Sequence, residues 1–135
     1  MERPKVLLVE DNRVLRWWML SGLEEAGFEV VSTASPEEAQ WLGACYEFDV
    51  LVTDWHLSGE KDGFEVMKHL RAKHPKLLSV LVSAQADADL AERAWAAGFN
   101  VVLQKPLRLA EVISAIYSML GEHEMRGVEV SHEAA

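Results

Sequence analysis

The stretch FDVLVTD, residues 48–54, decides the fold expected of this chain. Its centre is apolar and rich in β-branched side chains on both faces, which is typical of a strand buried inside a parallel sheet. Asp54 ends the stretch, and open α/β sheets bind their ligands at the carboxyl ends of such strands. A single aspartate there could equally cap the next turn. Its significance therefore depends on the residues that end the other strands.

Four further segments have the composition of short strands, and helical patterns separate all five. The strand segments are residues 6–9, 29–33, 48–54, 78–82 and 101–104, and the helical ones are about 13–26, 36–45, 63–72, 87–97 and 109–120. Right-handed crossovers between successive strands make the sheet parallel. The chain is therefore predicted to be an α/β protein: a doubly wound five-stranded parallel sheet of order 2-1-3-4-5 with five helices on both faces.

The first helix is expected to turn one arc toward the sheet and to leave two large side chains partly exposed. At about 100° per residue, the buried arc comprises Val14, Leu15, Trp18, Met19 and Leu23, and the exposed pair is Trp17 and Leu20. Exposed apolar side chains mark interaction surfaces in some proteins. Trp17 and Leu20 could therefore serve partner docking, or they could pack on neighbouring loops.

Composition narrows the class of protein. The chain has 135 residues and a net charge of -9, which argues against a nucleic-acid surface. Its one cysteine, Cys45, is expected to be a buried thiol and fits a reducing compartment. No segment resembles a signal peptide or a membrane span, so a cytoplasmic location is expected. Residues 1–121 are predicted to form one domain, and residues 122–135 a polar, disordered tail.

Acidic residues also follow the first strand, as Glu10 and Asp11. In the predicted sheet order these lie beside Asp54, in the crevice between the first and third strands. Three carboxylates close together repel one another unless a cation compensates them, and an all-oxygen ligand set suits Mg²⁺. A backbone carbonyl from the loop after residue 54 could add a ligand, and His56 is the best candidate.

Two more strand ends carry groups that bind phosphate. Ser83 ends the fourth strand with a hydroxyl donor, and Lys105 ends the fifth with a compact positive charge. A carboxylate nucleophile, a metal site, a cation and a hydroxyl together indicate phosphoryl transfer, which depends mostly on positioning and charge neutralisation.

These residues resemble the receiver domains of two-component response regulators. The motifs are residues 9–12 (VEDN), 52–54 (VTD), 62–63 (DG), 83–84 (SA) and 105–106 (KP), in order and at strand ends. The resemblance implies that Asp54 accepts a phosphoryl group from a phosphohistidine on a sensor histidine kinase or histidine phosphotransfer protein. It implies that Glu10, Asp11, Asp54 and the His56 carbonyl place Mg²⁺, and that the Lys105–Pro106 peptide is cis.

The same resemblance implies a switch that assists its own phosphorylation and dephosphorylation, rather than an enzyme with a separate substrate. Phosphorylation would alter partner binding at the face formed by the fourth helix, fifth strand and fifth helix. Two departures from the family pattern bear on how this switch works. Val102 stands where the family usually has Tyr or Phe, and Ser58 stands where a proline is common, in a loop one residue longer than usual. Trp95 is hypothesised to supply the aromatic surface that residue 102 lacks.

Two alternatives stay open on the sequence. The first is a pseudo-receiver, in which the same fold serves protein–protein contact without control by phosphorylation. The second is an aspartyl-phosphate hydrolase acting on small substrates. Such an enzyme would want a second acid two residues after Asp54, where this chain has His56.

Overall fold

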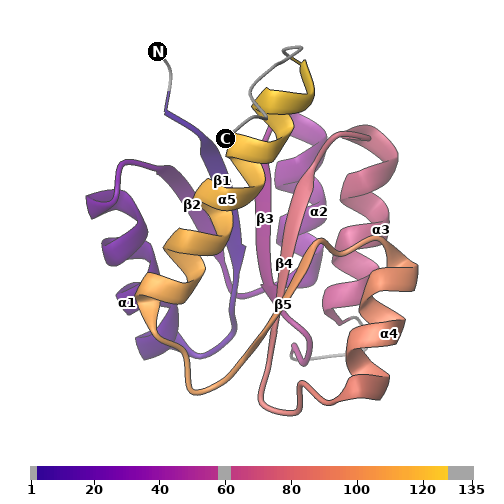
Figure 1. The fold of residues 1–135 in the computed structure, drawn as a ribbon. Coiled ribbons are helices and arrows are strands. Elements are labelled where there is room, and N and C mark those ends of the chain that lie inside the picture. The colour runs from indigo at the N-terminus through magenta and orange to yellow at the C-terminus, as the bar shows by residue number, and fades with distance from the viewer. Residues whose placement is uncertain (1–2, 58–61, 128–135) are drawn as a thin grey trace.

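The chain folds as five strand–helix units around one parallel sheet (Figure 1). The computed structural model describes residues 3–57 and 62–127. Its elements are β1 Lys5–Val9, α1 Arg13–Glu25, β2 Glu29–Thr33, α2 Pro36–Cys45, β3 Val50–Asp54, α3 Gly63–Lys73, β4 Leu78–Ser83, α4 Ala88–Ala97, β5 Val101–Gln104 and α5 Leu109–Gly127. The strand order is β2-β1-β3-β4-β5 with all pairs parallel, so the predicted fold class is confirmed.

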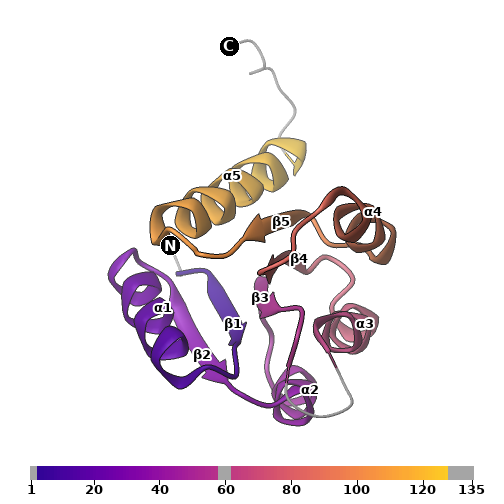
Figure 2. The ribbon, with the colours of Figure 1, turned by 90° about the horizontal axis from the view of Figure 1, so that it is seen from below.

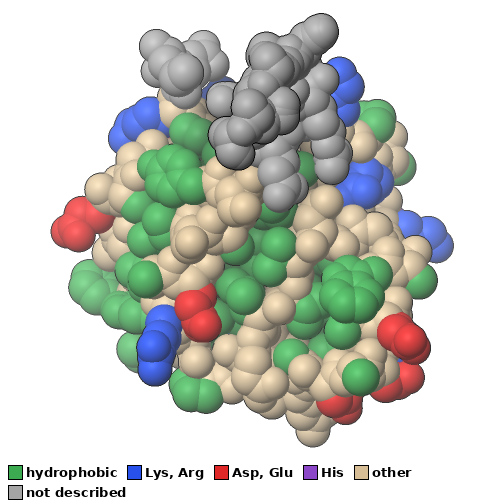
Figure 3. Space-filling model, viewed as in Figure 1, with side chains coloured by type: hydrophobic (Ala, Val, Ile, Leu, Met, Phe, Trp, Pro, Cys, Tyr) green, Lys and Arg blue, Asp and Glu red, His purple; other side chains and the backbone are tan. Residues whose placement is uncertain are grey.

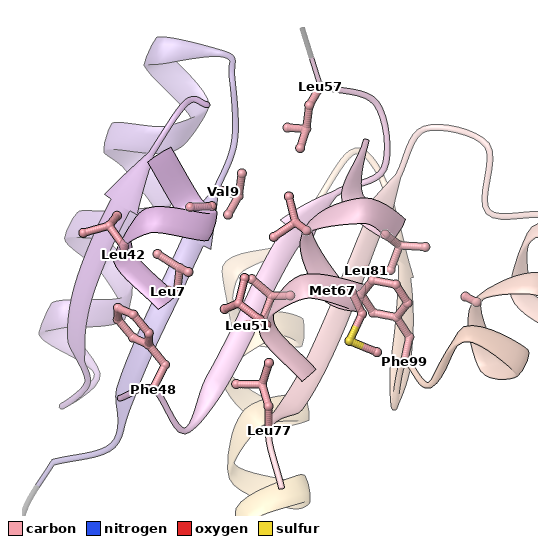
Figure 4. Packing of buried hydrophobic residues seen from close by; sticks show 14 of the residues in the cluster. Leu7, Val9, Leu42, Phe48, Leu51, Leu57, Met67, Leu77, Leu81 and Phe99 are labelled. Atoms are coloured by element: carbon pink, nitrogen blue, oxygen red, sulfur yellow. The ribbon is translucent and has the colours of Figure 1, made fainter. Parts of the chain in front are cut away.

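Helices cover both faces of the sheet, with α1 and α5 on one side and α2, α3 and α4 on the other (Figure 2). Successive side chains of a strand point to opposite faces. In β1, Val6 and Leu8 accordingly pack into the core under α1 and α5, whereas Leu7 and Val9 pack into the core under α2 to α4 (Figure 4). β3 is buried along its whole length. β3 is therefore the central strand of the sheet, with two strands on each side.

Polar caps begin the helices where the sequence provides them. Ser35 accepts a hydrogen bond from the backbone N–H of Glu38, three residues on, and Pro36 opens α2 as predicted. The Asp62 carboxylate accepts from the N–H groups of Phe64 and Glu65 and starts α3. α4 ends at Gly98, whose φ of 105° is strained for residues with a side chain.

The orientation of α1 differs from the prediction. Val14 is 76% exposed and Trp18 38% exposed, so neither faces the sheet. Met19 and Leu23 are buried as expected, and Trp17 is 67% exposed as expected. Arg16 is half-buried, and its guanidinium donates to the Glu10 carbonyl. Leu20, which was expected to lie outside the buried arc, packs against the core together with Leu15. The buried face is therefore centred further round the helix than the apolar pattern predicted.

Two further expectations are corrected. α5 was predicted to end at Leu120, but it continues through Gly121 to Gly127, so residues 122–127 of the expected tail are helical. One glycine disfavours a helix by only about 1 kcal/mol, too little to stop it. Residues 128–135 lie outside the described part of the chain. Cys45 is exposed rather than buried, because it lies in the last turn of α2 on the side away from the core.

Candidate functional site

The acidic residues meet at the carboxyl edge of the sheet. β1 and β3 are neighbours, and their register pairs Val9 with Thr53. Glu10 and Asp54, the next residue along each strand, therefore lie side by side. One carboxylate oxygen from each of Glu10, Asp11 and Asp54 lies within 4.8 Å of the others. The prediction that these three residues share one pocket is confirmed.

Lys105 reaches this pocket from the end of β5. Its Nζ lies 2.9 Å from Oδ2 of Asp54 and 3.2 Å from Oε1 of Glu10. Asp54 is 8% exposed and Glu10 2%, so both ion pairs are largely shielded from water. The Lys105–Pro106 peptide is cis, as the resemblance implied. The ammonium thus pairs with two of the three carboxylates, and because it carries one positive charge, the group keeps a net negative charge.

Burial and charge act together on the titratable groups of the pocket. Burial raises the pKa of the Glu10 carboxyl, and the negative charge of Asp54 adds to the rise, against a hydrogen bond from the Asn12 N–H and the charge of Lys105. Burial by itself would lower the pKa of Lys105, but hydrogen bonds and charges from Asp54 and Glu10 outweigh it and raise that pKa. The lysine is therefore held in its cationic form.

The β1–α1 turn is held by the backbone and by one arginine. The Glu10 N–H donates to the Thr33 carbonyl at 3.0 Å, and the Asn12 N–H donates to Oε2 of Glu10 at 3.0 Å. Nη1 of Arg16 donates to the Glu10 carbonyl oxygen at 2.8 Å. Sequence reasoning did not single out Arg16, because an arginine in the second turn of a helix is usually solvated.

A close backbone approach explains the glycine of the 62–63 motif. A Cβ atom on Gly63 would overlap the backbone carbonyl oxygen of Asp54. The Gly63 N–H also donates to the carbonyl of Trp55 at 2.9 Å. The first residue of α3 therefore rests directly on the backbone of Asp54. No side chain fits between them without displacing that residue.

Ser83 ends β4 and His56 follows β3, and the contacts described for both are with neighbouring segments. Ser83 is fully buried, and its hydroxyl accepts the Gln85 N–H at 3.0 Å, while its carbonyl accepts the Lys105 N–H at 2.9 Å. His56 is exposed, and its ring stacks on Trp55 with centroids 4.3 Å apart. The roles predicted for the Ser83 hydroxyl and the His56 carbonyl stay predictions. Ser58 lies outside the described residues.

The structure adds a contact that no local pattern in the sequence signals. The guanidinium carbon of Arg93, on α4, lies 5.4 Å from the ring centroid of Trp55 and 5.6 Å from that of Phe64.

Val102 is half-buried against the neighbouring core, and Trp95 is 60% exposed. The hypothesis that Trp95 supplies an aromatic surface beside Val102 stays a prediction.

The donor set of the pocket fits a hard divalent cation. It offers oxygen ligands from three carboxylates with a net negative charge, which is the preference of Mg²⁺.

None of the helices in the described ranges, 3–57 and 62–127, is both long and apolar enough to cross a membrane.

The chain is similar in sequence to bacterial transcriptional regulators. HprR, a transcriptional regulatory protein of Escherichia coli, is 28% identical over 120 residues that cover 88% of this chain and 52% of HprR. The cell cycle transcriptional regulator CtrA of Caulobacter vibrioides is 27% identical over 116 residues, covering 86% of this chain and 50% of CtrA. The chain thus spans about half the length of these two relatives.

Solved structures share the fold at lower identity. A CheY-like receiver domain protein from Methanospirillum hungatei superimposes with a TM-score of 0.84 at 21% identity, covering 91% of this chain and 98% of that one. The chemotaxis protein CheY4 of Vibrio cholerae gives 0.80 at 24% identity, covering 86% and 98%. The family model for the response regulator receiver domain matches residues 6–117. This chain therefore belongs to the response regulator receiver domain family of two-component systems.

Proposed function

We propose that this receiver domain is a phosphorylation-controlled switch in the cytoplasm, with Asp54 as its phosphoacceptor. The phosphoryl donor is a phosphohistidine on a sensor histidine kinase or a histidine phosphotransfer protein. The observation that carries the proposal is the setting of Asp54. It ends the central strand, is 8% exposed, pairs with Lys105 and lies beside two more carboxylates.

The reaction is a transfer between two nucleophiles. A carboxylate oxygen of Asp54 attacks phosphorus, and the P–N bond of the phosphohistidine breaks with its electron pair returning to the imidazole. Asp54 then carries an acyl phosphate in place of its carboxylate charge. Lys105, which pairs with Asp54 at 2.9 Å, keeps its cation beside the new phosphoryl oxygens. The Ser83 hydroxyl is proposed as a further donor to that group.

Glu10, Asp11, Asp54 and the backbone carbonyl of His56 are the proposed ligands of Mg²⁺. When bound, the ion supplies positive charge to the phosphoryl oxygens and to the crowded carboxylates. This chain's own part is to hold the three carboxylates together, through the turn tied by Arg16 and through the β1–β3 pairing.

The output surface is proposed to be the α4–β5–α5 face. Hydrophobic side chains gather between α5 and α4, over β5, on the side of the molecule seen in Figure 3. Trp95 of α4 is 60% exposed, and the side chains of β5 are half-buried up to Leu103. A partner that binds one state of this face better than the other would convert phosphorylation into a signal.

A separate surface on α1 is proposed to receive the phosphoryl donor. Val14 and Trp17 are both exposed there, immediately after the β1–α1 turn that carries Glu10 and Asp11. An apolar surface bordering the acceptor pocket would let a donor protein dock while its phosphohistidine reaches Asp54.

Labelling by acetyl phosphate with Mg²⁺ tests the acceptor without a kinase. The native chain is expected to gain one base-labile phosphoryl group by mass spectrometry, and Asp54→Asn none. Asp49→Asn is the matched control, because Asp49 is an exposed aspartate at the other end of the same strand region. Labelling that survived Asp54→Asn would move the acceptor. No labelling, and no binding of beryllofluoride, would favour a pseudo-receiver.

A further inference from the structure

Arg93 joins α4 to the segment that follows Asp54. Its guanidinium carbon lies 5.4 Å from the centroid of the Trp55 ring and 5.6 Å from that of Phe64, so it contacts two rings at once. Among residues 3–57 and 62–127, no carboxylate forms an ion pair with Arg93. Both ring contacts are favourable, because a cation over an aromatic face is attracted by the ring quadrupole.

The backbone of Trp55 is fixed beside the acceptor pocket. It is the residue after Asp54, its N–H donates to the Val82 carbonyl at 2.9 Å, and its own carbonyl accepts from Gly63 at 2.9 Å. Its ring stacks on His56, whose carbonyl is a proposed metal ligand. A change in the backbone at Asp54 or His56 therefore reaches the Trp55 ring through one covalent link.

Arg93 belongs to the helix that leads to the output face. α4 is held to the core by Leu90 and Ala94, on either side of Arg93 in the helix, while Arg93 itself is exposed. Trp95 lies two residues further along the same helix. The Phe64 ring that Arg93 also contacts meets Phe99 edge-on at 5.6 Å, just beyond the end of α4. The Arg93 side chain thus connects α4 with the residue that follows Asp54.

We propose that the Trp55–Arg93 contact couples the Asp54 pocket to α4 in this chain. A strand residue at position 102 cannot serve as an aromatic link here, because it is valine. The contact provides a different route. Phosphorylation of Asp54 shifts the Trp55 ring, the Arg93 guanidinium moves with that ring, and α4 moves with Arg93. The inference rests on the proposed phosphoacceptor function, since it concerns what pocket loading does elsewhere.

The size of the coupling is limited by the exposure of the contact. A cation–π pair at a partly exposed site changes an equilibrium constant by about two- to fivefold. Coupling between two sites is also reciprocal, so a variant that breaks the contact weakens the response at α4 to events in the pocket by a similar factor. The effect is modest but lies within reach of spectroscopy.

The chain carries its own reporters at both ends of this route. Labelling with 5-fluorotryptophan gives one ¹⁹F signal for each of the five tryptophans. Two of these signals serve as reporters, Trp55 beside the pocket and Trp95 on α4, and Trp55→Phe and Trp95→Phe assign them. Spectra are recorded with Mg²⁺ alone and with Mg²⁺ plus beryllofluoride, which stands in for the phosphoryl group. The variants are Arg93→Met, Arg93→Lys and, as a matched control on the same exposed part of α4, Glu92→Gln.

In the native chain and in Glu92→Gln, beryllofluoride is expected to shift both signals. In Arg93→Met the Trp55 shift remains, while the Trp95 shift falls by about two- to fivefold. Arg93→Lys, which keeps a cation, recovers most of the Trp95 shift. A merely structural role for Arg93 would not separate the two signals in this way.

Two results would overturn the inference while leaving the phosphoacceptor function intact. One is a Trp95 shift in Arg93→Met as large as in the native chain. The other is a native chain in which Trp55 responds and Trp95 does not. If neither signal moves and beryllofluoride does not bind, the proposed phosphoacceptor function itself fails, and the coupling fails with it.

Discussion

Nζ of Lys105 lies 2.9 Å from Oδ2 of Asp54, although 51 residues separate the two in the chain. The parallel sheet brings them together, since β3 and β5 flank β4 and end at the same edge. The same ammonium also pairs with Glu10. One cation therefore pairs with the two most buried carboxylates of the acidic pocket.

Removing this cation should destabilise the metal-free fold. Lys105→Met is expected to lower the free energy of unfolding by about 1–3 kcal/mol, because it leaves crowded carboxylates without their partner. Adding Glu10→Gln to that variant should restore part of the loss by removing one buried charge. Urea unfolding with a chelator present measures both. If Glu10→Gln instead lowered the stability of Lys105→Met further, repulsion among the acids would not be the cause.

Magnesium should stabilise the native chain through the three carboxylates. At ten times its dissociation constant, an ion that binds only the folded state adds about 1.4 kcal/mol to the free energy of unfolding. The gain in stability should vanish in Asp11→Asn and persist in Asp49→Asn. In the native chain the Asp49 carboxylate accepts the Lys5 N–H. Thermal melts with and without Mg²⁺ test this. An equal gain in both variants would place the ion elsewhere.

Gly63 should be sensitive to the smallest side chain. Gly63→Ala would force a Cβ against the Asp54 carbonyl oxygen, so we expect a loss of about 1–3 kcal/mol and reduced acetyl phosphate labelling. Gly121→Ala is the control, because a Cβ at Gly121 has no neighbour within 4 Å and helix propensity favours alanine. It should leave stability unchanged or raise it. A labelled, fully stable Gly63→Ala protein would contradict the close approach.

The corrected orientation of α1 predicts opposite effects for neighbouring residues. Met19 is 1% exposed, so Met19→Ala should lower the free energy of unfolding by about 2–5 kcal/mol. Trp17→Gln should change it by less than about 0.5 kcal/mol, since that side chain is 67% exposed. Chemical denaturation of the two variants compares them directly. A large loss for Trp17→Gln would show that its ring packs on the fold.

The sequence determined the order of elements and most of their limits. Capping residues and apolar periodicity are local signals, so α2 and the strands β2 and β5 could be predicted to the residue, and Asp87 and Gly98 marked the two ends of α4. Grouping of Glu10, Asp11 and Asp54 also followed, because residues that end adjacent parallel strands must share one edge of the sheet.

The tertiary structure alone decided which neighbours these residues have. Arg16 bonds to the Glu10 carbonyl while Val14 is exposed, Gly63 rests on Asp54, and Arg93 lies over Trp55. Each of these depends on how one helix is rotated or placed against another part of the chain. Local periodicity describes a helix in isolation, whereas its rotation is chosen by close packing and hydrogen bonds with segments distant in the sequence.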